Sequence, residues 1–151
     1  MNAIKEFRNE YYFLSNFYEA PVTYEGITYQ NNEAAFQAAK VTTEKERMKF
    51  STLNPSEAKK LGRRVNLRKD WEDVKIQVMK DVVLSKFTQN DDLREKLLAT
   101  GSTYLEEGNT WGDRIWGTVD GVGANNLGKI LMEVRELIRE KTNAVEIDVD
   151  R

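Results

Sequence analysis

The segment from residue 70 to residue 87 constrains the fold more than any other part of this sequence. Its side chains recur at the 3.6-residue spacing of one helical face, which distinguishes an α-helix from a strand. The members of this face are Trp71, Val74, Val78, Val82 and Ser85, with Met79 and Val83 beside them. The pattern therefore predicts a long helix with one buried side.

Shorter patterns predict further elements on either side of this helix. Residues 20–30 place Val22, Tyr24, Ile27 and Tyr29 around Glu25-Gly26, which is typical of a β-hairpin. An alanine-rich helix is expected over 33–41 behind a cap at Asn31 or Asn32. The remaining expected elements are a short helix through 46–50 capped by Thr42 or Thr43, a helix from Asn54-Pro55 to about Gly62, a helix from Asn90 to Gly101, a strand at 103–105, and a final helix opened by Asn125 or Asn126.

These elements fit one domain. A chain of 151 residues with 40% hydrophobic residues can bury one core but is too short for two comfortable ones. We expect a mainly α, α+β fold: a single helix-rich domain over residues 1–141 with a small N-terminal β-hairpin. Residues 142–151 form an acidic segment that we expect to be a flexible tail.

Composition excludes several kinds of site. The chain has no cysteine and no histidine, which removes thiolate metal sites, a cysteine nucleophile and a Ser-His-Asp triad. Any catalysis therefore uses carboxylates, lysine, tyrosine or water. The net charge of −2 gives no global basic field toward nucleic acid or anionic membranes. Without a membrane-length apolar stretch or a secretory signal, we expect a soluble cytoplasmic protein.

A polar row follows the predicted alanine-rich helix. Glu33, Gln37 and Lys40 are spaced so that all three project from one helical face. Such a row is either an ordinary solvated face or the wall of a pocket. The surrounding alanines allow close packing on several sides, which favours a central position for this helix.

Three other segments leave a structural and a functional interpretation open. In LSNFY, Asn16 either binds the local backbone in a turn or presents its amide to a ligand. Trp71 is either a core residue or a stacking surface, and Lys86 is either a solvated charge or a ligand contact.

The glycine-rich segment NTWGDRIWGTVDGVGANNLG carries Asp113 and Trp116 in a loop, with Asn125 at the next helix start. Loops carry function more often than other segments, but aromatic anchoring of the loop would explain the same residues. The segment lacks the Gly-Lys-Ser/Thr ending of a phosphate-binding loop, so we exclude a nucleoside triphosphatase.

Together these residues supply acids, lysines, amides and tryptophans without histidine. This inventory is compatible with cleavage of an N-glycosidic bond, in which a carboxylate stabilises an oxocarbenium-like transition state or activates water. Tryptophans would stack on the leaving base and cations would hold phosphates.

A family resemblance selects this chemistry among those the composition allows. The segments FRNEYYFLSNFY, ITYQNNEAAFQAAK, LRKDWEDVKIQVMKDVVLSKF, LLATG, DRIWG and NNLGKILMEVRE occur in the order seen in the NADAR family. The resemblance covers about residues 4–139, and several short motifs in one order make it specific. It implies an N-glycosidase-like fold for the whole domain.

The resemblance also implies site residues. Family motif residues map onto Asn16, Phe17, Glu33, Lys40, Trp71, Lys86, Asp113, Trp116 and Asn125. On this basis we predict catalytic roles for Glu33, Lys40 and Asp113, and substrate contacts at Asn16, Phe17, Trp71, Lys86, Trp116 and Asn125, to which our mechanistic hypothesis adds Arg8. Many members have histidine directly after the glutamate, where this chain has Ala34. That difference would alter the substrate or weaken proton transfer unless the position faces away from the site.

The resemblance implies two possible substrates: phosphorylated ribosylamino-pyrimidines that are early riboflavin intermediates, or ADP-ribose attached to guanine, including guanine in nucleic acid. Hydrolysis of either needs no metal and no redox cofactor. Glu33 would act at the anomeric carbon, Asp113 would orient the ribose or water, and Lys40 would stabilise charge or form a Schiff base. The competing interpretations are a non-catalytic ADP-ribose or nucleotide-binding module and a helical interaction domain without a pocket.

Overall fold

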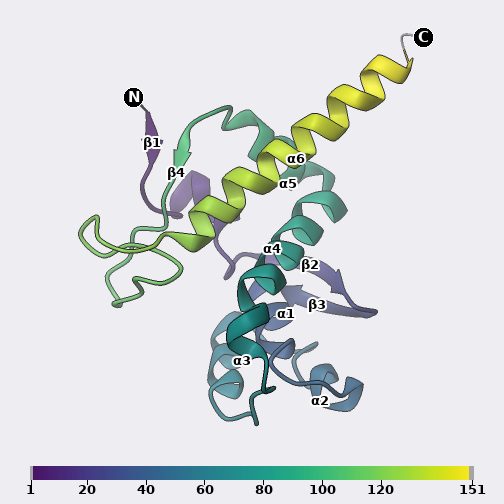
Figure 1. The fold of residues 1–151 in the computed structure, drawn as a ribbon, viewed down its shortest axis with the longest axis vertical. Coiled ribbons are helices and arrows are strands. Elements are labelled where there is room, and N and C mark those ends of the chain that lie inside the picture. Colours follow the sequence, from purple (N-terminus) through teal and green to yellow (C-terminus); the bar gives the residue numbers. More distant parts are fainter. Residues whose placement is uncertain (1, 150–151) are drawn as a thin grey trace.

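The computed structural model describes residues 2–149, with side chains described to Asn143. The predicted long helix is α4 (Trp71–Gln89), which runs through the middle of the molecule (Figure 1). It contacts the hairpin strand β2 (Glu19–Tyr24), the short helix α1 (Asn32–Ala38) and the C-terminal helix α6 (Asn126–Val149). Its buried apolar side chains belong to the hydrophobic core, so the predicted packing around one buried face is confirmed.

The predicted hairpin is formed by β2 and β3 (Ile27–Asn31). Glu25 and Gly26 at the turn both have positive φ, at 49° and 85°, as a type I′ turn requires. Val22 pairs with Tyr29, and both side chains are buried against the core. The hairpin leads directly into α1.

Helix α1 is the most enclosed element of the fold. Each of its residues is buried, and the Asn31 side chain caps it by accepting a hydrogen bond from the Ala34 N–H at 2.8 Å. The helix ends at Ala38, three residues before the predicted end at residue 41. The reason is tertiary: the carbonyl groups of Ala39 and Lys40 accept hydrogen bonds from the Arg68 side chain and backbone.

The other helices follow the predicted pattern. Thr43 caps α2 (Glu44–Met48), and Asn54 forms a reciprocal capping box with Glu57 at the start of α3 (Pro55–Gly62). Helix α5 (Asp91–Ala99) follows Asn90, whose side chain binds the carbonyls of Pro21 and Lys86 instead of capping the helix.

Of a second pair of strands, one strand was predicted and the other was not. The expected strand at 103–105 is β4 (Tyr104–Leu105), and it pairs in parallel with β1 (Ala3–Ile4). Two residues carry too little pattern for β1 to be recognised. A 3-10 helix, η1 (Asn9–Leu14), then leads toward the hairpin.

The C-terminal helix extends beyond the predicted domain limit. Helix α6 continues to Val149, into the segment 142–151 for which we predict a tail. Side chains from residue 144 onward, and residues 150–151, lie outside the described part, so a flexible tail stays a prediction. The structure confirms a helix-rich α+β domain with an N-terminal hairpin.

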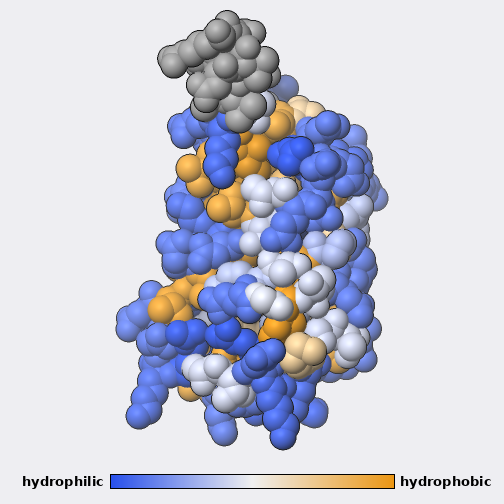
Figure 2. Space-filling view, turned by 90° about the vertical axis from the view of Figure 1, so that its right-hand side faces the viewer, coloured by the Kyte–Doolittle hydropathy of each residue, from blue (hydrophilic) through white to orange (hydrophobic). Residues whose placement is uncertain are grey.

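The surface is mostly hydrophilic on the face seen in Figure 2, where apolar side chains occur in separate small groups. Within residues 2–149, no helix combines the length and apolar character needed to cross a bilayer.

Candidate active site

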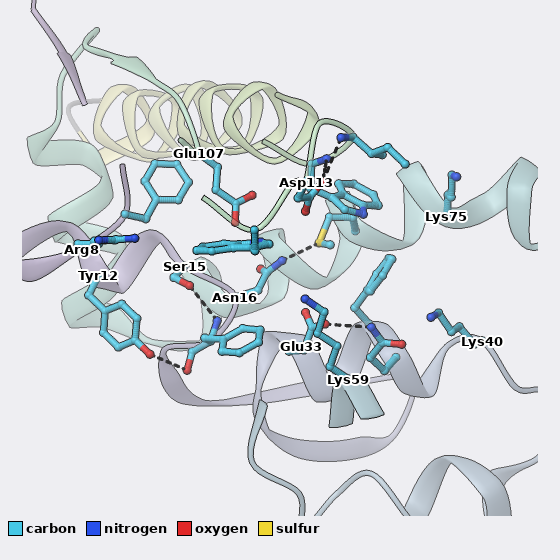
Figure 3. Close-up of a pocket in the computed structure, with 18 of the residues that line it drawn as sticks. Arg8, Tyr12, Ser15, Asn16, Glu33, Lys40, Lys59, Lys75, Glu107 and Asp113 are labelled. Carbon is cyan, nitrogen blue, oxygen red and sulfur yellow. Dashed lines mark hydrogen bonds between the residues drawn. The ribbon is translucent and has the colours of Figure 1, made fainter. Parts of the chain in front are cut away.

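A cavity of about 540 Å³ opens between α1, the start of α4, the N-terminal segment around η1 and the glycine-rich loop (Figure 3). This volume lies within the range typical of small-molecule sites. Its walls include most of the predicted site residues: Arg8, Asn16, Phe17, Glu33, Lys40, Trp71, Asp113 and Trp116. Residues from distant parts of the sequence therefore meet in one pocket, which excludes a helical interaction domain without a pocket.

Positively charged side chains lie at both ends of this cavity, and carboxylates lie between them. Arg8 lies at one end, Lys40 and Lys75 lie at the other, and the carboxylates of Glu33, Glu107 and Asp113 lie between them (Figure 3). Among residues 2–143, no three acidic side chains are grouped closely enough to hold a metal ion.

Glu33 is buried at the start of α1, where its carboxylate accepts a hydrogen bond from the Gln37 amide at 2.9 Å. Burial raises the pKa of Glu33, while the Gln37 hydrogen bond and the nearby Lys59 and Lys40 oppose that rise. A buried carboxyl group with a raised pKa in a cavity is a candidate for proton transfer.

Asn16 is hydrogen-bonded to the start of α1, which carries Glu33. The Glu33 N–H donates to the Asn16 carbonyl at 3.1 Å, and the Asn32 amide donates to the Asn16 side-chain oxygen at 3.2 Å. The Asn16 amide in turn donates to the Met79 sulfur at 3.4 Å. Asn16 is thus bound to the helix that carries Glu33 and also faces the cavity.

Lys40 follows the last turn of α1 and is half-buried at the cavity end. Its ammonium lies 5.9 Å from the centroid of the Trp71 ring. Burial lowers the pKa of Lys40, with Arg63 adding to the effect and Glu33 opposing it. A lowered pKa increases the fraction of neutral amine, which a Schiff-base nucleophile needs.

Asp113 is fixed within the glycine-rich loop. Its Oδ1 accepts hydrogen bonds from the N–H groups of Ile115 and Trp116, at 3.0 and 2.9 Å. Asn109 binds its backbone from both sides: the Asp113 N–H donates to Oδ1 of Asn109, and the Asn109 amide donates to the Asp113 carbonyl. The spacing in DRIW is therefore that of a side-chain-capped turn, which holds the acid at the cavity wall.

Aromatic rings form the remaining walls. Phe36 packs between Trp71 and Trp116, with ring centroids 5.1 and 5.3 Å away. Trp111 also lines the cavity but is 58% exposed, so it offers a face to solvent or ligand. Lys59 lies over the Phe17 ring at 5.9 Å.

Two predicted contact residues do not line the cavity. Lys86 is fully buried, and its ammonium donates to the carbonyls of Phe13 and Ser15 at 2.6 and 3.0 Å. The Asn125 side chain accepts from the Glu107 N–H and donates to the Leu105 carbonyl. Both residues hold backbone segments that carry the site.

Sequence reasoning missed Glu107, Lys59 and Trp111, all of which line the cavity. An acidic pair directly after a predicted strand was the available signal for Glu107. Burial, together with Asp113 and Glu33, raises the pKa of Glu107 to about 8, and Lys59 opposes this rise. Lys59 carries no distinguishing pattern, because Lys60 stands beside it.

Comparison with known proteins shows the family of the chain. The family model of the NADAR domain matches residues 4–139. The chain belongs to the NADAR family. It is 41% identical over 132 residues to the N-glycosidase YbiA of Escherichia coli, covering 85% of this chain and 82% of YbiA. It is 39% identical over 132 residues to the riboflavin biosynthesis protein VVA0006 of Vibrio vulnificus, of which it spans only 36%.

The fold of this chain is similar to that of E. coli YbiA. The NMR structure of E. coli YbiA superimposes with a TM-score of 0.83 at 37% identity, covering 93% of this chain and 87% of the other. Ala34, which stands where many members have histidine, is fully buried in the core and does not line the cavity. Ala34 therefore contributes no side chain to the cavity wall in this structure.

Proposed function

We propose that this protein is an N-glycosidase that hydrolyses the bond between ribose and a nitrogenous base, with phosphorylated ribosylamino-pyrimidines as substrates. One observation carries the proposal: Glu33 and Asp113, far apart in the sequence, face one cavity with aromatic walls and flanking cations. The N-glycosidase name of one relative and the riboflavin biosynthesis name of another support the same reaction and substrate class.

Glu33 acts at the anomeric carbon. Cleavage of the C1–N bond develops positive charge on the ribose, and a buried carboxylate stabilises that charge or takes a proton from the attacking water. Gln37, Lys59 and Lys40 keep Glu33 more acidic than burial alone would. Asp113, whose Oδ1 is engaged by the loop N–H groups, directs its other oxygen toward ribose hydroxyls or water.

Lys40 has two possible roles within this reaction. As an ammonium it stabilises negative charge on a phosphate or leaving group. As a neutral amine it adds to C1 of the ring-opened sugar, and the C1–N bond to the base then breaks as the departing nitrogen takes up a proton. The resulting Lys40 Schiff base is hydrolysed by water, which releases the sugar and restores the amine. The lowered pKa of Lys40 is compatible with the second role.

The aromatic and cationic residues bind the remainder of the substrate. Trp71, Trp116 and the exposed Trp111 provide flat apolar surfaces for a base. Arg8 at one end of the cavity, and Lys40 with Lys75 at the other, provide partners for phosphate oxygens (Figure 3).

A side-by-side assay tests this function. The purified protein is incubated with a phosphoribosylamino-pyrimidine and, separately, with ADP-ribosylated guanine DNA, and free base and ADP-ribose are quantified. Release of pyrimidine with little ADP-ribose supports the proposal, and the reverse result assigns the second substrate class. If neither bond is cleaved while ADP-ribose binds equally to the parent and to Glu33→Gln, the protein is a binding module.

A further inference from the structure

Two adjacent glutamates follow strand β4, and the fold separates them. Glu106 is directed to Thr118, whose hydroxyl donates to its carboxylate at 2.6 Å. Glu107 lines the cavity with Glu33 and Asp113, and its Oε2 is buried without a hydrogen-bond partner among the described residues. A buried, unpaired carboxylate oxygen is costly when it is charged, so this environment favours a protonated carboxyl group.

The backbone of Glu107 is fixed on both sides, so its side chain reaches the cavity from a set position. Its N–H donates to the Asn125 side chain at 3.0 Å, and its carbonyl accepts from the Thr118 N–H at 2.9 Å. Asn109 links the two acids of the loop, because its amide contacts the carbonyls of both Glu107 and Asp113. A side chain at Gly117 would overlap the Glu107 carbonyl, which explains the glycine there.

Glu33 and Glu107 have different surroundings in the same cavity. Burial, and to a smaller extent Asp113, raises the pKa of Glu33 too, but a hydrogen bond from Gln37 and two lysines, Lys59 and Lys40, oppose that rise. For Glu107, burial raises the pKa, Asp113 and Glu33 add to the rise, and Lys59 opposes it, while no hydrogen bond reaches its buried Oε2 among the described residues. Two carboxyl groups whose surroundings differ in this way are suited to opposite proton-transfer roles.

We propose that Glu107 is the general acid of this site: its carboxyl group donates a proton to the leaving base, while Glu33 serves as the carboxylate partner. The inference rests on the proposed N-glycosidase function and assigns a catalytic residue within it. The C1–N bond breaks with its electron pair on nitrogen, and the Glu107 proton moves to that nitrogen. Water adds its oxygen to C1 and gives its proton to Glu33, and exchange with solvent restores both groups.

The pH dependence follows from the surroundings of Glu107. Because burial raises the pKa of Glu107 to about 8, the proton is present at neutral pH and is lost as the pH rises through that value. The rate on a substrate whose base must be protonated should therefore fall on the alkaline side. A substrate with a leaving group that departs as an anion should not show this fall.

The test compares Glu107→Gln with its neighbour Glu106→Gln on two substrates. One is a phosphoribosylamino-pyrimidine, and the other is nitrophenyl 5-phosphoribofuranoside, whose nitrophenolate departs without protonation. On the first, we expect Glu107→Gln to lower kcat by about 10²–10⁴-fold and remove the alkaline limb, as is typical for loss of a general acid. On the nitrophenyl substrate, the kcat of Glu107→Gln should stay within a few-fold of the parent value. The kcat of the control Glu106→Gln should stay within a few-fold of the parent value on both substrates.

Each outcome decides the proposal. Equal losses on both substrates, or a Glu107→Gln variant that behaves like Glu106→Gln, would overturn the role of Glu107 while leaving the N-glycosidase function intact. If the parent protein releases nothing from either substrate, the function fails and the inference fails with it. If Glu107→Gln does not fold, the pH–rate profiles of the parent protein on the two substrates test the proposal. The proposal is contradicted if the rate on the amino-pyrimidine does not fall at alkaline pH, or if the rates on both substrates fall equally.

Discussion

The side chain of Gln37 donates a hydrogen bond to the carboxylate of Glu33 at 2.9 Å, one helical turn away on α1. The other face of the same amide lies against Gly62 at the end of α3, where a side chain would overlap the Gln37 amide. Gly62 thus leaves the space in which Gln37 points at the acid. This contact couples the packing of α1 on α3 to the protonation of Glu33.

We therefore expect Gly62→Ala to impair catalysis from outside the cavity. Displacing Gln37 removes a hydrogen bond to a charged group, worth about 1.5–3 kcal/mol, so kcat should fall by roughly ten- to a hundredfold. The acid limb of the pH–rate profile should also move to higher pH, because Gln37 lowers the pKa of Glu33. Lys60→Ala, an exposed change in the same helix, is the control, and an unchanged acid limb in Gly62→Ala would contradict the coupling.

Glu33→Gln should retain substrate binding and lose turnover. The amide keeps the size of the side chain but removes both its charge and its ability to accept a proton. A loss of about 10²–10⁴ in kcat is expected for a proton-transfer group. Single-turnover rates and equilibrium binding separate the two effects, with Glu44→Gln on the exposed start of α2 as control. A variant that binds weakly but turns over normally would assign Glu33 to binding instead.

Substitutions of Lys40 distinguish its two roles. Lys40→Arg keeps a positive charge but cannot form a Schiff base, whereas Lys40→Ala removes both functions. A Schiff-base mechanism predicts that borohydride with substrate traps an adduct on Lys40 and that Lys40→Arg is as inactive as Lys40→Ala. An electrostatic role predicts no adduct and substantial activity in Lys40→Arg. Lys75→Ala, at the same end of the cavity, controls for a simple loss of charge.

If the amine is the nucleophile, activity also depends on pH in a defined direction. Burial lowers the pKa of Lys40, so the neutral amine is present above that lowered value and is protonated as the pH falls through it. The trapping yield should therefore decrease toward acid pH. A yield that does not change with pH would exclude the amine as the attacking group.

Trp111→Ala should affect binding more than chemistry. The ring is exposed at the cavity edge, and stacking on a base contributes about 1–3 kcal/mol, so KM should rise roughly tenfold or more while kcat changes little. Trp116→Ala is the comparison, because Trp116 packs edge-on against Phe36 and its loss should lower the melting temperature. An unchanged KM in Trp111→Ala would remove this ring from the substrate site.

Lys86 should make stability depend on pH. Burial lowers the pKa of Lys86 to about 7, whereas in the unfolded chain its pKa returns to the ordinary lysine value of 10.5. Between these two values the unfolded state binds more protons, so the free energy of unfolding should rise as the pH increases from about 7 toward 10. Urea unfolding at several pH values measures this rise. It should disappear in Lys86→Met and persist in Lys80→Met, which removes a more exposed lysine of the same helix.

Local patterns predicted most of the elements correctly. The 3.6-residue spacing identified α4, Glu25-Gly26 located the hairpin turn, and Asn54-Pro55 located the start of α3. These features depend on backbone propensity and on capping within a few residues, so neighbouring sequence is sufficient to specify them. The end of α1 was misplaced, because it is set by hydrogen bonds from Arg68, which lies far along the chain.

Local sequence specifies most of the helices, the hairpin, the absence of histidine and cysteine, and the set of acids available to a site. Tertiary structure decided which of two neighbours faces the cavity: Glu107 and not Glu106, and Lys59 and not Lys60. It also placed Lys86 beneath the loop that it supports. Adjacent side chains on a strand or helix point in different directions, and local sequence does not fix which direction meets a pocket. That choice comes from contacts between segments far apart in the chain.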